Sequence, residues 1–541
     1  MSIASSRDDD VLDVLVVGAG ISGLSAARKL VSSRVCQIAV VEAKDRIGGR
    51  TETVRLEAKD GKAGVWDLGG QWVCRTQTDV LELLAEFGIE TYKQHTDGIN
   101  VLLLNVGDKF LFNGVTPPLP WLSLIDTENC IRKIDQAAAT VPVDDPLKCR
   151  DAYDWDRMTL EDFFRLHIWT EPAAELHALV ARLAMGTEPS RMSLLYYLHF
   201  CNAAGGLLKL AETTEGSAQE WKIKGSTASL VQCLVDAVGR DRVFCDLPVT
   251  HITQTDDVVT VQTLAGQTFR AKKIILAIPP QQISRITIDP PLPTRYQYLS
   301  QHMPVGHLSK FVATYTTPFW RNRGYSGNVS SSSALSDRVK QMAVAEGISL
   351  DGCITYSPVC CVWDATTHDG LPALVGLQGG KVATQWSCQP LEFHKKVILK
   401  ELKYLLGDEA DDPVDFALRD WSTVPWNGGC PISYLTPGAM TGFGGYKTLR
   451  KPWHHIHFAG TELATVWCGY MSGAVQSGHR AAAEVLHNLR PDQFPALGDS
   501  ESSEEPKEGH KPKKQISLLY FLLVAGTLAL GLYASQRFRS L

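Results

Sequence analysis

The hydrophobic pattern of the chain is clearest between residues 11 and 42. The apolar run VLDVLVVGAG predicts a buried strand that ends in a glycine-rich turn, and the following ISGLSAARKL has the apolar spacing of a helix. The next segment, CQIAVVE, is apolar and β-branched, as expected for a second strand. The order strand, turn, helix, strand predicts a βαβ unit.

Four further regions have patterns of their own. Residues 243–280 alternate short strands with polar turns, and residues 454–486 predict a strand followed by a helix. Residues 160–210 have helical spacing and many aromatic side chains, which predicts a separate helical layer. Residues 327–333 (GNVSSSS) are low in complexity and predict an exposed loop insertion. Together these patterns predict an α/β fold.

Composition narrows the classes of function. The chain has 541 residues, of which 44% are hydrophobic and 21% charged, so it can bury a large core divided among two or three domains. Acidic residues outnumber basic ones, 59 to 53, so nucleic acid is not an expected partner. The 13 cysteines are too dilute for a disulfide scaffold and indicate a reducing compartment. His454, His455 and His457 are too close together on a predicted strand to converge on a metal, so no metal site is expected.

The C-terminal region departs from this composition. Residues 516–533 (ISLLYFLLVAGTLALGLY) carry no charge, and as a helix they would be about 27 Å long, enough for a thin bilayer. A charged tether precedes them, and basic residues flank them on both sides (Lys511, Lys513, Lys514, Arg537 and Arg539). We expect a transmembrane tail anchor in the mitochondrial outer membrane, with the catalytic body in the cytosol. The alternative is a C-terminal helix packed on that body.

The first strand and helix are joined by a dinucleotide-binding motif. Gly18, Gly20 and Gly23 form GxGxxG, where a tight turn and a helix N-terminus together suit a pyrophosphate. Glu42 ends the second strand, where its carboxylate can accept hydrogen bonds from ribose hydroxyls. This order of strand, turn, helix and acid predicts a dinucleotide cofactor.

Four further motifs indicate which cofactor it is: AKDRIGGR (Ala43 to Arg50), WDLGGQW (Trp66 to Trp72), WSTVPWNGGC (Trp421 to Cys430) and FAGTE (Phe458 to Glu462). Their arrangement resembles the flavin-dependent amine oxidase family over nearly all of the chain before the tether, and most closely its monoamine oxidase branch. The resemblance implies FAD as the cofactor. It places Arg46 and Arg50 beside the diphosphate, Gly69 and Gly70 against the flavin, Gly460 and Glu462 at the ribitol or pyrophosphate, Val249 at the adenine through its backbone, and Trp421 in the cofactor site.

The resemblance also assigns two reactive side chains. Cys430 matches the cysteine that carries the flavin through a thioether, and the two preceding glycines leave its sulfur accessible to a planar ligand. Lys310 matches a lysine that holds a water against the reactive nitrogen of the flavin. A helix beginning near Trp467 would aim its positive end at a flavin carbonyl.

The substrate pocket is expected to depart from the family pattern. Monoamine oxidases enclose the amine between two tyrosines, of which one matches Tyr470, whereas Pro431 occupies the position of the other and offers no aromatic face. Tyr434 or Trp426 are the candidates to replace it. Gln219 matches a glutamine of the substrate pocket.

These observations predict a Rossmann-like FAD-binding domain interleaved with an α+β substrate domain, plus a C-terminal transmembrane helix. The expected reaction is FAD-dependent oxidative deamination of a small-molecule amine to imine and aldehyde, with dioxygen reduced to hydrogen peroxide and ammonia released. Three alternatives stay open: a polyamine oxidase, an amino-acid oxidase in which Arg75 would bind the carboxylate, and a catalytically impaired, membrane-tethered flavoprotein. A homodimer is also left open. The expected FAD-binding parts are 1–90, 225–300 and 415–495, the substrate-domain parts are 91–224 and 301–414, the tether is 496–515 and the anchor is 516–533.

Overall fold

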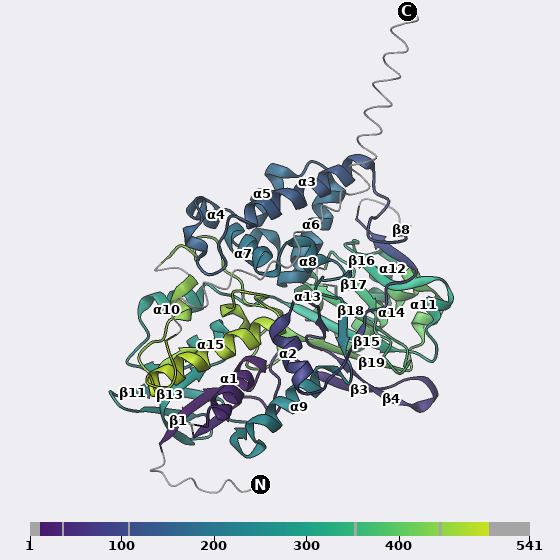
Figure 1. The fold of residues 1–541 in the computed structure, drawn as a ribbon. Helices are drawn as coiled ribbons and strands as arrows, with labels where there is room; N and C mark the ends of the chain where they lie inside the picture. Colours follow the sequence, from purple (N-terminus) through teal and green to yellow (C-terminus); the bar gives the residue numbers. More distant parts are fainter. Residues whose placement is uncertain (1–10, 35–36, 106–108, 351–353, 443–445, 497–541) are drawn as a thin grey trace, which may run out of the picture.

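The structure is a computed structural model that describes residues 11–34, 37–105, 109–350, 354–442 and 446–496. Two large sheets organise it (Figure 1). The α/β class expected from the sequence is confirmed, with parallel and antiparallel pairings in both sheets. The boundaries given above for the interleaved parts stay a prediction.

The first sheet gathers strands from three separate parts of the chain. Its order is β10, β2, β1, β13, β12, β11, β14, and β20 also pairs with β13. β1, β2, β13 and β20 are mutually parallel where they pair, whereas β12 runs antiparallel to both its neighbours. The strands are β1 (Leu12–Val17), β2 (Ile38–Val41), β10 (Val243–Phe244), β11 (Val249–Gln254), β12 (Val259–Thr263), β13 (Thr268–Leu276), β14 (Thr287–Asp289) and β20 (Ile456–Phe458).

The alternation of side chains along β1 explains why its whole sequence is apolar. Val14 and Val16 pack in a core with three helices, α1 (Ile21–Ser32), α9 (Ser226–Val238) and α15 (Met471–Leu489). Leu15 and Val17 point to the opposite face and belong to a second core, which includes residues of the helical layer. Because both faces of the sheet are covered, every position from Val14 to Val17 is buried.

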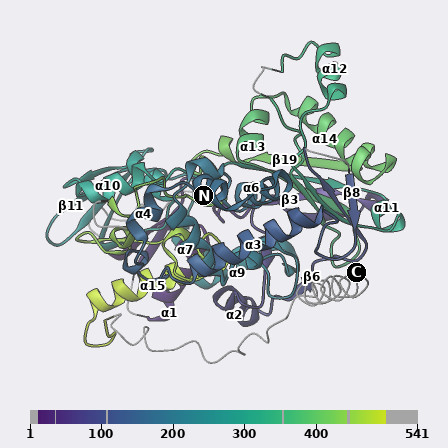
Figure 2. The same ribbon diagram turned by 90° about the horizontal axis from the view of Figure 1, so that it is seen from above.

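The second sheet lies at the other end of the molecule: Figure 2 shows β11 and α10 at one end and β8 and α11 at the other. Its order is β19, β15, β18, β17, β16, β7, β8. The strands are β7 (Ile99–Leu103), β8 (Lys109–Phe112), β15 (Leu308–Thr314), β16 (Tyr325–Ser331), β17 (Cys361–Asp364), β18 (Ala373–Gly379) and β19 (Asp415–Asp420). Two small sheets pair β3 (Thr53–Glu57) with β4 (Ala63–Asp67), and β9 (Trp221–Ile223) with β5 (Trp72–Val73) and β6 (Thr91–Lys93).

The expectation of an exposed loop at residues 327–333 was wrong. Most of this segment belongs to β16, which pairs with β7 and β17 inside the second sheet. Serines of the segment have hydrogen-bond partners: the Ser332 hydroxyl donates to Glu175 Oε2 at 2.9 Å, and the hydroxyls of Ser331 and Ser333 lie 3.0 Å apart. Small polar side chains with such partners can be buried, which composition alone does not reveal.

The helical layer expected between residues 160 and 210 is present and lies beside the two sheets (Figure 1). None of the helices in the described part of the chain is both long and apolar enough to cross a membrane. The predicted anchor, 516–533, and the tether from residue 497 lie outside the described residues. The remaining helices are α2 (Thr78–Glu86), α3 (Trp121–Ala138), α4 (Ala152–Arg157), α5 (Leu160–His167), α6 (Glu171–Met185), α7 (Leu194–Ala204), α8 (Leu207–Ala211), α10 (Thr294–Gln301), α11 (Phe319–Asn322), α12 (Asp337–Ala345), α13 (Lys381–Trp386) and α14 (Leu391–Leu406).

Candidate functional site

The turn between β1 and α1 has the close backbone approach that the glycine motif predicts. Gly18 has φ +108°, and a Cβ atom on Gly23 would lie 1.9 Å from the Gly18 carbonyl oxygen. No side chain caps the N-terminus of α1. The Ser22 hydroxyl there is buried and has no hydrogen-bond partner among the described residues. An anion at this turn would meet unpaired donors and the positive end of the helix.

Glu42 follows the last residue of β2, at the carboxyl end of the strand and beside this turn. Its carboxylate is buried and accepts hydrogen bonds from the backbone N–H groups of Ala19, at 2.8 Å, and Lys44, at 3.1 Å. Each carboxylate oxygen has a further lone pair for a ligand hydroxyl. Two backbone bonds thus fix the carboxylate where the sequence predicts a ribose contact.

Arg50 and Glu462 form a bidentate ion pair. The Arg50 guanidinium donates to the two carboxylate oxygens of Glu462 at 2.6 and 3.0 Å, and also to the carbonyl of Pro431 at 2.8 Å. Burial raises the pKa of the Glu462 carboxyl, but the adjacent Arg50 outweighs this effect and leaves the pKa below its usual value. Both groups are therefore charged at neutral pH.

Arg46 and Lys44 add positive charge to the same region. Arg46 donates to the carbonyls of Gly49 and Thr51, pairs with Glu52 at 2.8 Å, and lies 5.9 Å from the centre of the Trp421 ring. Lys44 Nζ donates to the Gly49 carbonyl at 3.1 Å, and burial together with Arg46 lowers its pKa to about 8. Sequence reasoning missed Lys44, although it stands inside the AKDRIGGR motif.

Gly69 is closely packed by backbone atoms, whereas the adjacent Gly70 is open. A Cβ atom on Gly69 would lie 2.2 Å from the Arg50 carbonyl oxygen, whereas Gly70 is exposed and only Met471 and Thr51 side-chain atoms lie near it, at 3.9 Å. Trp421 is buried, and its indole N–H donates to the Leu68 carbonyl at 2.9 Å. Gly70 therefore presents open backbone where a planar ring could approach.

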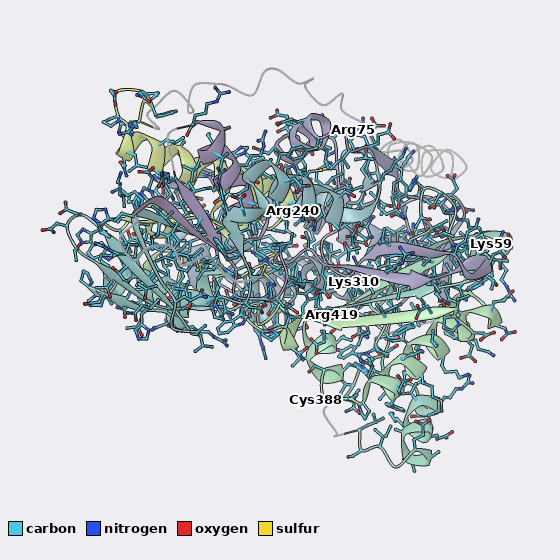
Figure 3. The ribbon with its side chains drawn as sticks, turned by 90° about the horizontal axis from the view of Figure 1, so that it is seen from below. Lys59, Arg75, Arg240, Lys310, Cys388 and Arg419 are labelled. Atoms are coloured by element: carbon cyan, nitrogen blue, oxygen red, sulfur yellow. The ribbon has the colours of Figure 1, made fainter. Side chains whose placement is uncertain are left out.

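Lys310 is buried at the middle of β15, and its ammonium donates to the Gly69 carbonyl at 2.8 Å and to Gln71 Oε1 at 2.6 Å. The indole ring of Trp72 lies 5.3 Å from the same nitrogen. Figure 3 shows Lys310 near the middle of the molecule beside Arg419, to which it pairs across the sheet. Gln71 and Trp72 were missed, although both stand in WDLGGQW.

Cys430 packs with Trp421, Val424 and Leu308 in a small buried cluster. Gly428 and Gly429 have φ of +69° and +147°, so the two residues before the cysteine have a conformation that favours glycine. Burial raises the pKa of the Cys430 thiol to about 12, while Arg50 and Lys310 oppose this shift. Arg50 and Lys310 thus lie close enough to Cys430 to affect its charge.

Tyr470 precedes α15, which begins at Met471, four residues later than the expected start near Trp467. Trp467 has φ +49°, and its carbonyl accepts the Tyr470 N–H, so WCGY forms a turn before the helix. The Tyr470 ring stacks on Phe200 of α7 with centroids 6.2 Å apart. A Cβ atom on Gly469 would lie 2.8 Å from the Ile432 side chain, so this turn packs against the segment that contains Cys430 and Ile432.

The other residues predicted for the cofactor site and the substrate pocket lie in several separate elements. Gln219 donates to the Leu210 carbonyl at 3.4 Å, and its Oε1 is buried with no partner among the described residues. Val249 begins β11 and is buried, and Gly460, with φ +144°, donates its N–H to the Ser477 hydroxyl. The Tyr434 ring belongs to the main core, and its hydroxyl accepts a hydrogen bond from Thr187. Trp426 is half-buried.

Arg75, the candidate for a substrate carboxylate, is already paired. Its guanidinium donates to Glu220, with Nε at 2.8 Å from Oε1, and forms an ion pair with Glu215. No group of three or more His, Cys, Asp or Glu side chains that could hold a metal occurs in the described parts of the chain. The His455 ring contacts backbone carbonyls and His457 contacts Glu484.

These residues fit FAD on three counts. The glycine turn has a cradle that a side chain would fill, an orphaned Ser22 hydroxyl lies at the helix N-terminus, and open backbone at Gly70 continues to Lys310 and Cys430. Arg46 and Lys44 both donate to the carbonyl of Gly49, and Gly49 lies against Gly20 of the turn.

Comparison with known proteins agrees with this arrangement. A family model described as flavin-containing amine oxidoreductase matches residues 21–486. Amine oxidase (flavin-containing) B of Canis lupus familiaris is 34% identical over 542 residues, which cover 97% of this chain and 98% of that protein. Among solved structures, cyclohexylamine oxidase from Brevibacterium oxydans IH-35A superposes with a TM-score of 0.79 at 29% identity, over 89% of this chain and 100% of that one. Putrescine oxidase bound to putrescine gives a TM-score of 0.78 at 28% identity, over 88% and 99%.

The buried Lys310 makes stability depend on pH in a predictable direction. Burial lowers the pKa of Lys310 to about 7 from its usual 10.5. Between these values the unfolded chain binds the proton and the folded chain does not, so this group makes stability rise with pH. Lys310→Met should therefore raise the midpoint of thermal unfolding most at pH 6, and the gain should shrink progressively from pH 7 to pH 10. A gain that stayed constant over this range would contradict a neutral, buried Lys310.

Proposed function

The chain belongs to the flavin-containing amine oxidoreductase family, and from this premise we propose that its substrates are primary arylalkyl or related monoamines. The reaction converts the amine to an imine, which hydrolyses to aldehyde and ammonia, and reduces dioxygen to hydrogen peroxide. FAD supplies the transfer of two electrons from the amine to dioxygen. The observation that carries this proposal is the buried Lys310. It donates hydrogen bonds to Gly69 and Gln71 and, with Arg50, lies near Cys430.

The residues around this centre favour an uncharged amine. Phe200 and Tyr470 offer stacked aromatic rings, and the buried Oε1 of Gln219 is an unused acceptor for an amine N–H. Burial lowers the pKa of Lys310 to about 7, so this group carries only part of its positive charge at neutral pH. An amino-acid substrate needs a free guanidinium for its carboxylate, and Arg75 is engaged by two glutamates. A diamine remains the second candidate because of the similarity to putrescine oxidase.

Anaerobic mixing with amines tests the proposal. Phenethylamine should bleach the flavin absorption of the purified protein, whereas a diamine such as putrescine should bleach it at least roughly tenfold more slowly, a difference of about 1.4 kcal/mol in the barrier. Faster bleaching by putrescine would establish the diamine class instead. Bleaching by no amine would favour the catalytically impaired flavoprotein.

The cofactor is proposed to be bound covalently through Cys430. The support is the pair of positive-φ glycines before it, the indole of Trp421 against it, and its place beside Lys310 and Arg50. A thioether would make retention of the flavin independent of free cofactor concentration.

Acid precipitation distinguishes covalent from reversible binding. The wild-type precipitate should stay yellow, and a peptide that contains Cys430 should carry the mass of the flavin. Cys430→Ala should release its flavin into the supernatant. Cys468→Ala, which alters another buried cysteine of the same region, should behave like the wild type. Release of all colour from the wild type would refute the bond.

Attachment to the mitochondrial outer membrane is proposed through residues 516–533, on the strength of their charge-free sequence and basic flanks. A second contact is proposed through four exposed apolar side chains: Trp121 and Leu122 of α3, Leu166 of α5, and Trp169, which follows α5. These side chains are 51–73% exposed, and Asp126 of α3 accepts the Trp169 N–H at 2.8 Å, which holds the two segments together. Tryptophan is enriched at membrane interfaces.

Fractionation of the full-length and shortened proteins tests both contacts. The full chain should resist alkaline carbonate extraction, and removal of the residues from Lys511 onward should release it with its flavin. The shortened protein should retain weak affinity for anionic vesicles. The double substitution Trp121→Ser and Trp169→Ser should reduce that affinity roughly tenfold, whereas Tyr404→Ser, which removes an exposed ring elsewhere, should not. Extraction of the full-length protein by carbonate would refute the anchor.

A further inference from the structure

A polar pocket of about 210 Å³ leads from the surface toward Lys310. Its outer lining includes the exposed residues Arg55, His368 and Asp369. Its inner lining includes three buried polar side chains, Gln71, Asp67 and Lys222. The residues proposed to face the amine, Tyr470 and Gln219, are not part of the lining. The pocket thus extends to Gln71, the hydrogen-bond partner of Lys310, without including either of these two residues.

Gln71 joins this pocket to Lys310. Its Oε1 accepts the Lys310 ammonium proton at 2.6 Å, while its Nε2 is buried and has no hydrogen-bond partner among the described residues. The side chain is 6% exposed and forms part of the pocket lining. An unpaired buried amide costs about 1–3 kcal/mol, which a water molecule in the polar pocket would offset.

The walls of the inner pocket carry both signs of charge. Lys222 Nζ donates to the carbonyls of Asp364 and Thr366 at 3.3 and 3.2 Å and lies 4.9 Å from the centre of the Tyr92 ring. Asp67 accepts hydrogen bonds from Thr53 and Thr227. The titratable groups that affect Lys310 are Asp67, Cys430 and Lys222. Such a lining suits ordered water better than an apolar ligand.

We propose that water in this pocket, held by the Nε2 of Gln71, reaches Lys310 and connects it to bulk solvent, as a proton route separate from the amine-binding face. Reduction of dioxygen to hydrogen peroxide consumes two electrons and two protons. If the reduced flavin delivers both electrons and one proton, the second proton must come from solvent, and Lys310 is placed to pass it on. This use of the route rests on the proposed function, whereas the route itself rests on the pocket geometry alone.

Competitive acetylation with acetic anhydride tests the route in the holoenzyme without any turnover. Ala63 lines the pocket on β4 and is half-buried, so Ala63→Phe should narrow it. At pH 8, acetylation of Lys310 and Lys222, read from their peptides by mass spectrometry, should fall roughly tenfold. Lys44 is the internal control, because it is equally buried but lies outside the pocket lining, and its acetylation should not change.

A second pair of variants tests the role of Gln71. Gln71→Leu removes the acceptor of the Lys310 ammonium and should shift the midpoint of Lys310 acetylation to lower pH. Gln71→Glu adds a carboxylate and should shift it to higher pH, by about one unit. A purely structural role for Gln71 would not move the two midpoints in opposite directions.

Two outcomes would overturn the proposal. Slower acetylation of Lys222 with unchanged acetylation of Lys310 in Ala63→Phe would show that the pocket ends before the lysine. Unchanged midpoints in both Gln71 variants would show that Gln71 does not connect the two. If Ala63→Phe fails to fold, Ala63→Cys blocked with a bulky maleimide replaces it, with the wild type treated identically as control. A failure of amine bleaching alone would affect the proposed function and leave the route standing.

Discussion

The bidentate ion pair between the half-buried Arg50 and the buried Glu462 is the contact on which the geometry of the site depends. It joins residues 412 positions apart in the sequence through hydrogen bonds of 2.6 and 3.0 Å. Arg50 also donates to the Pro431 carbonyl, and Glu462 accepts the Ser433 N–H at 3.2 Å. One ion pair thus fixes three segments, which carry the arginines predicted at the diphosphate, the cysteine proposed to carry the flavin, and the FAGTE motif. Loss of Arg50 would leave the Glu462 carboxylate buried without a compensating charge, which typically costs about 3–5 kcal/mol.

The protein also buries other charged side chains, at a cost in desolvation. Lys310, Lys222 and Asp364 are at most 6% exposed, and Asp364 pairs with Arg321 at 2.6 Å and accepts the Trp320 indole N–H at 2.7 Å. Burial lowers the pKa of Lys222 to about 8 and that of Lys310 to about 7. Apolar residues of similar size would avoid this cost of desolvation. Titratable groups perturbed in this way, beside a pocket and a predicted cofactor, are the pattern expected of a functional centre.

Local motifs predicted the parts of the site that depend on short-range geometry. The βαβ unit, Gly18, Gly23 and Glu42 follow from a turn of a few residues, and the described structure places them together. The contacts made by Gln71 and Trp72 could not be predicted from the motif. Gln71 accepts a hydrogen bond from Lys310, 239 positions away in the sequence, and Trp72 of β5 donates to Gln94, which follows β6. The serine-rich segment was misjudged for the same reason, since its partners in β7 lie far away in sequence. Composition describes a segment, whereas burial depends on what packs against it.

Position 431 shows how backbone and side chain can carry separate functions. The contact that Pro431 makes with Arg50 uses its carbonyl oxygen, which every residue has, so proline preserves the frame around Cys430. What proline lacks is an aromatic face, and the described structure offers other aromatic surfaces beside Lys310 and Tyr470. Trp72 lies against Lys310 and packs edge-to-face on Trp363 with centroids 5.1 Å apart, and Phe200 stacks on Tyr470. Because Trp72 is anchored through its own indole N–H to Gln94, its ring orientation does not depend on residue 431. The departure from the family pattern therefore bears on the shape of the amine pocket and leaves the framework of the cofactor site intact.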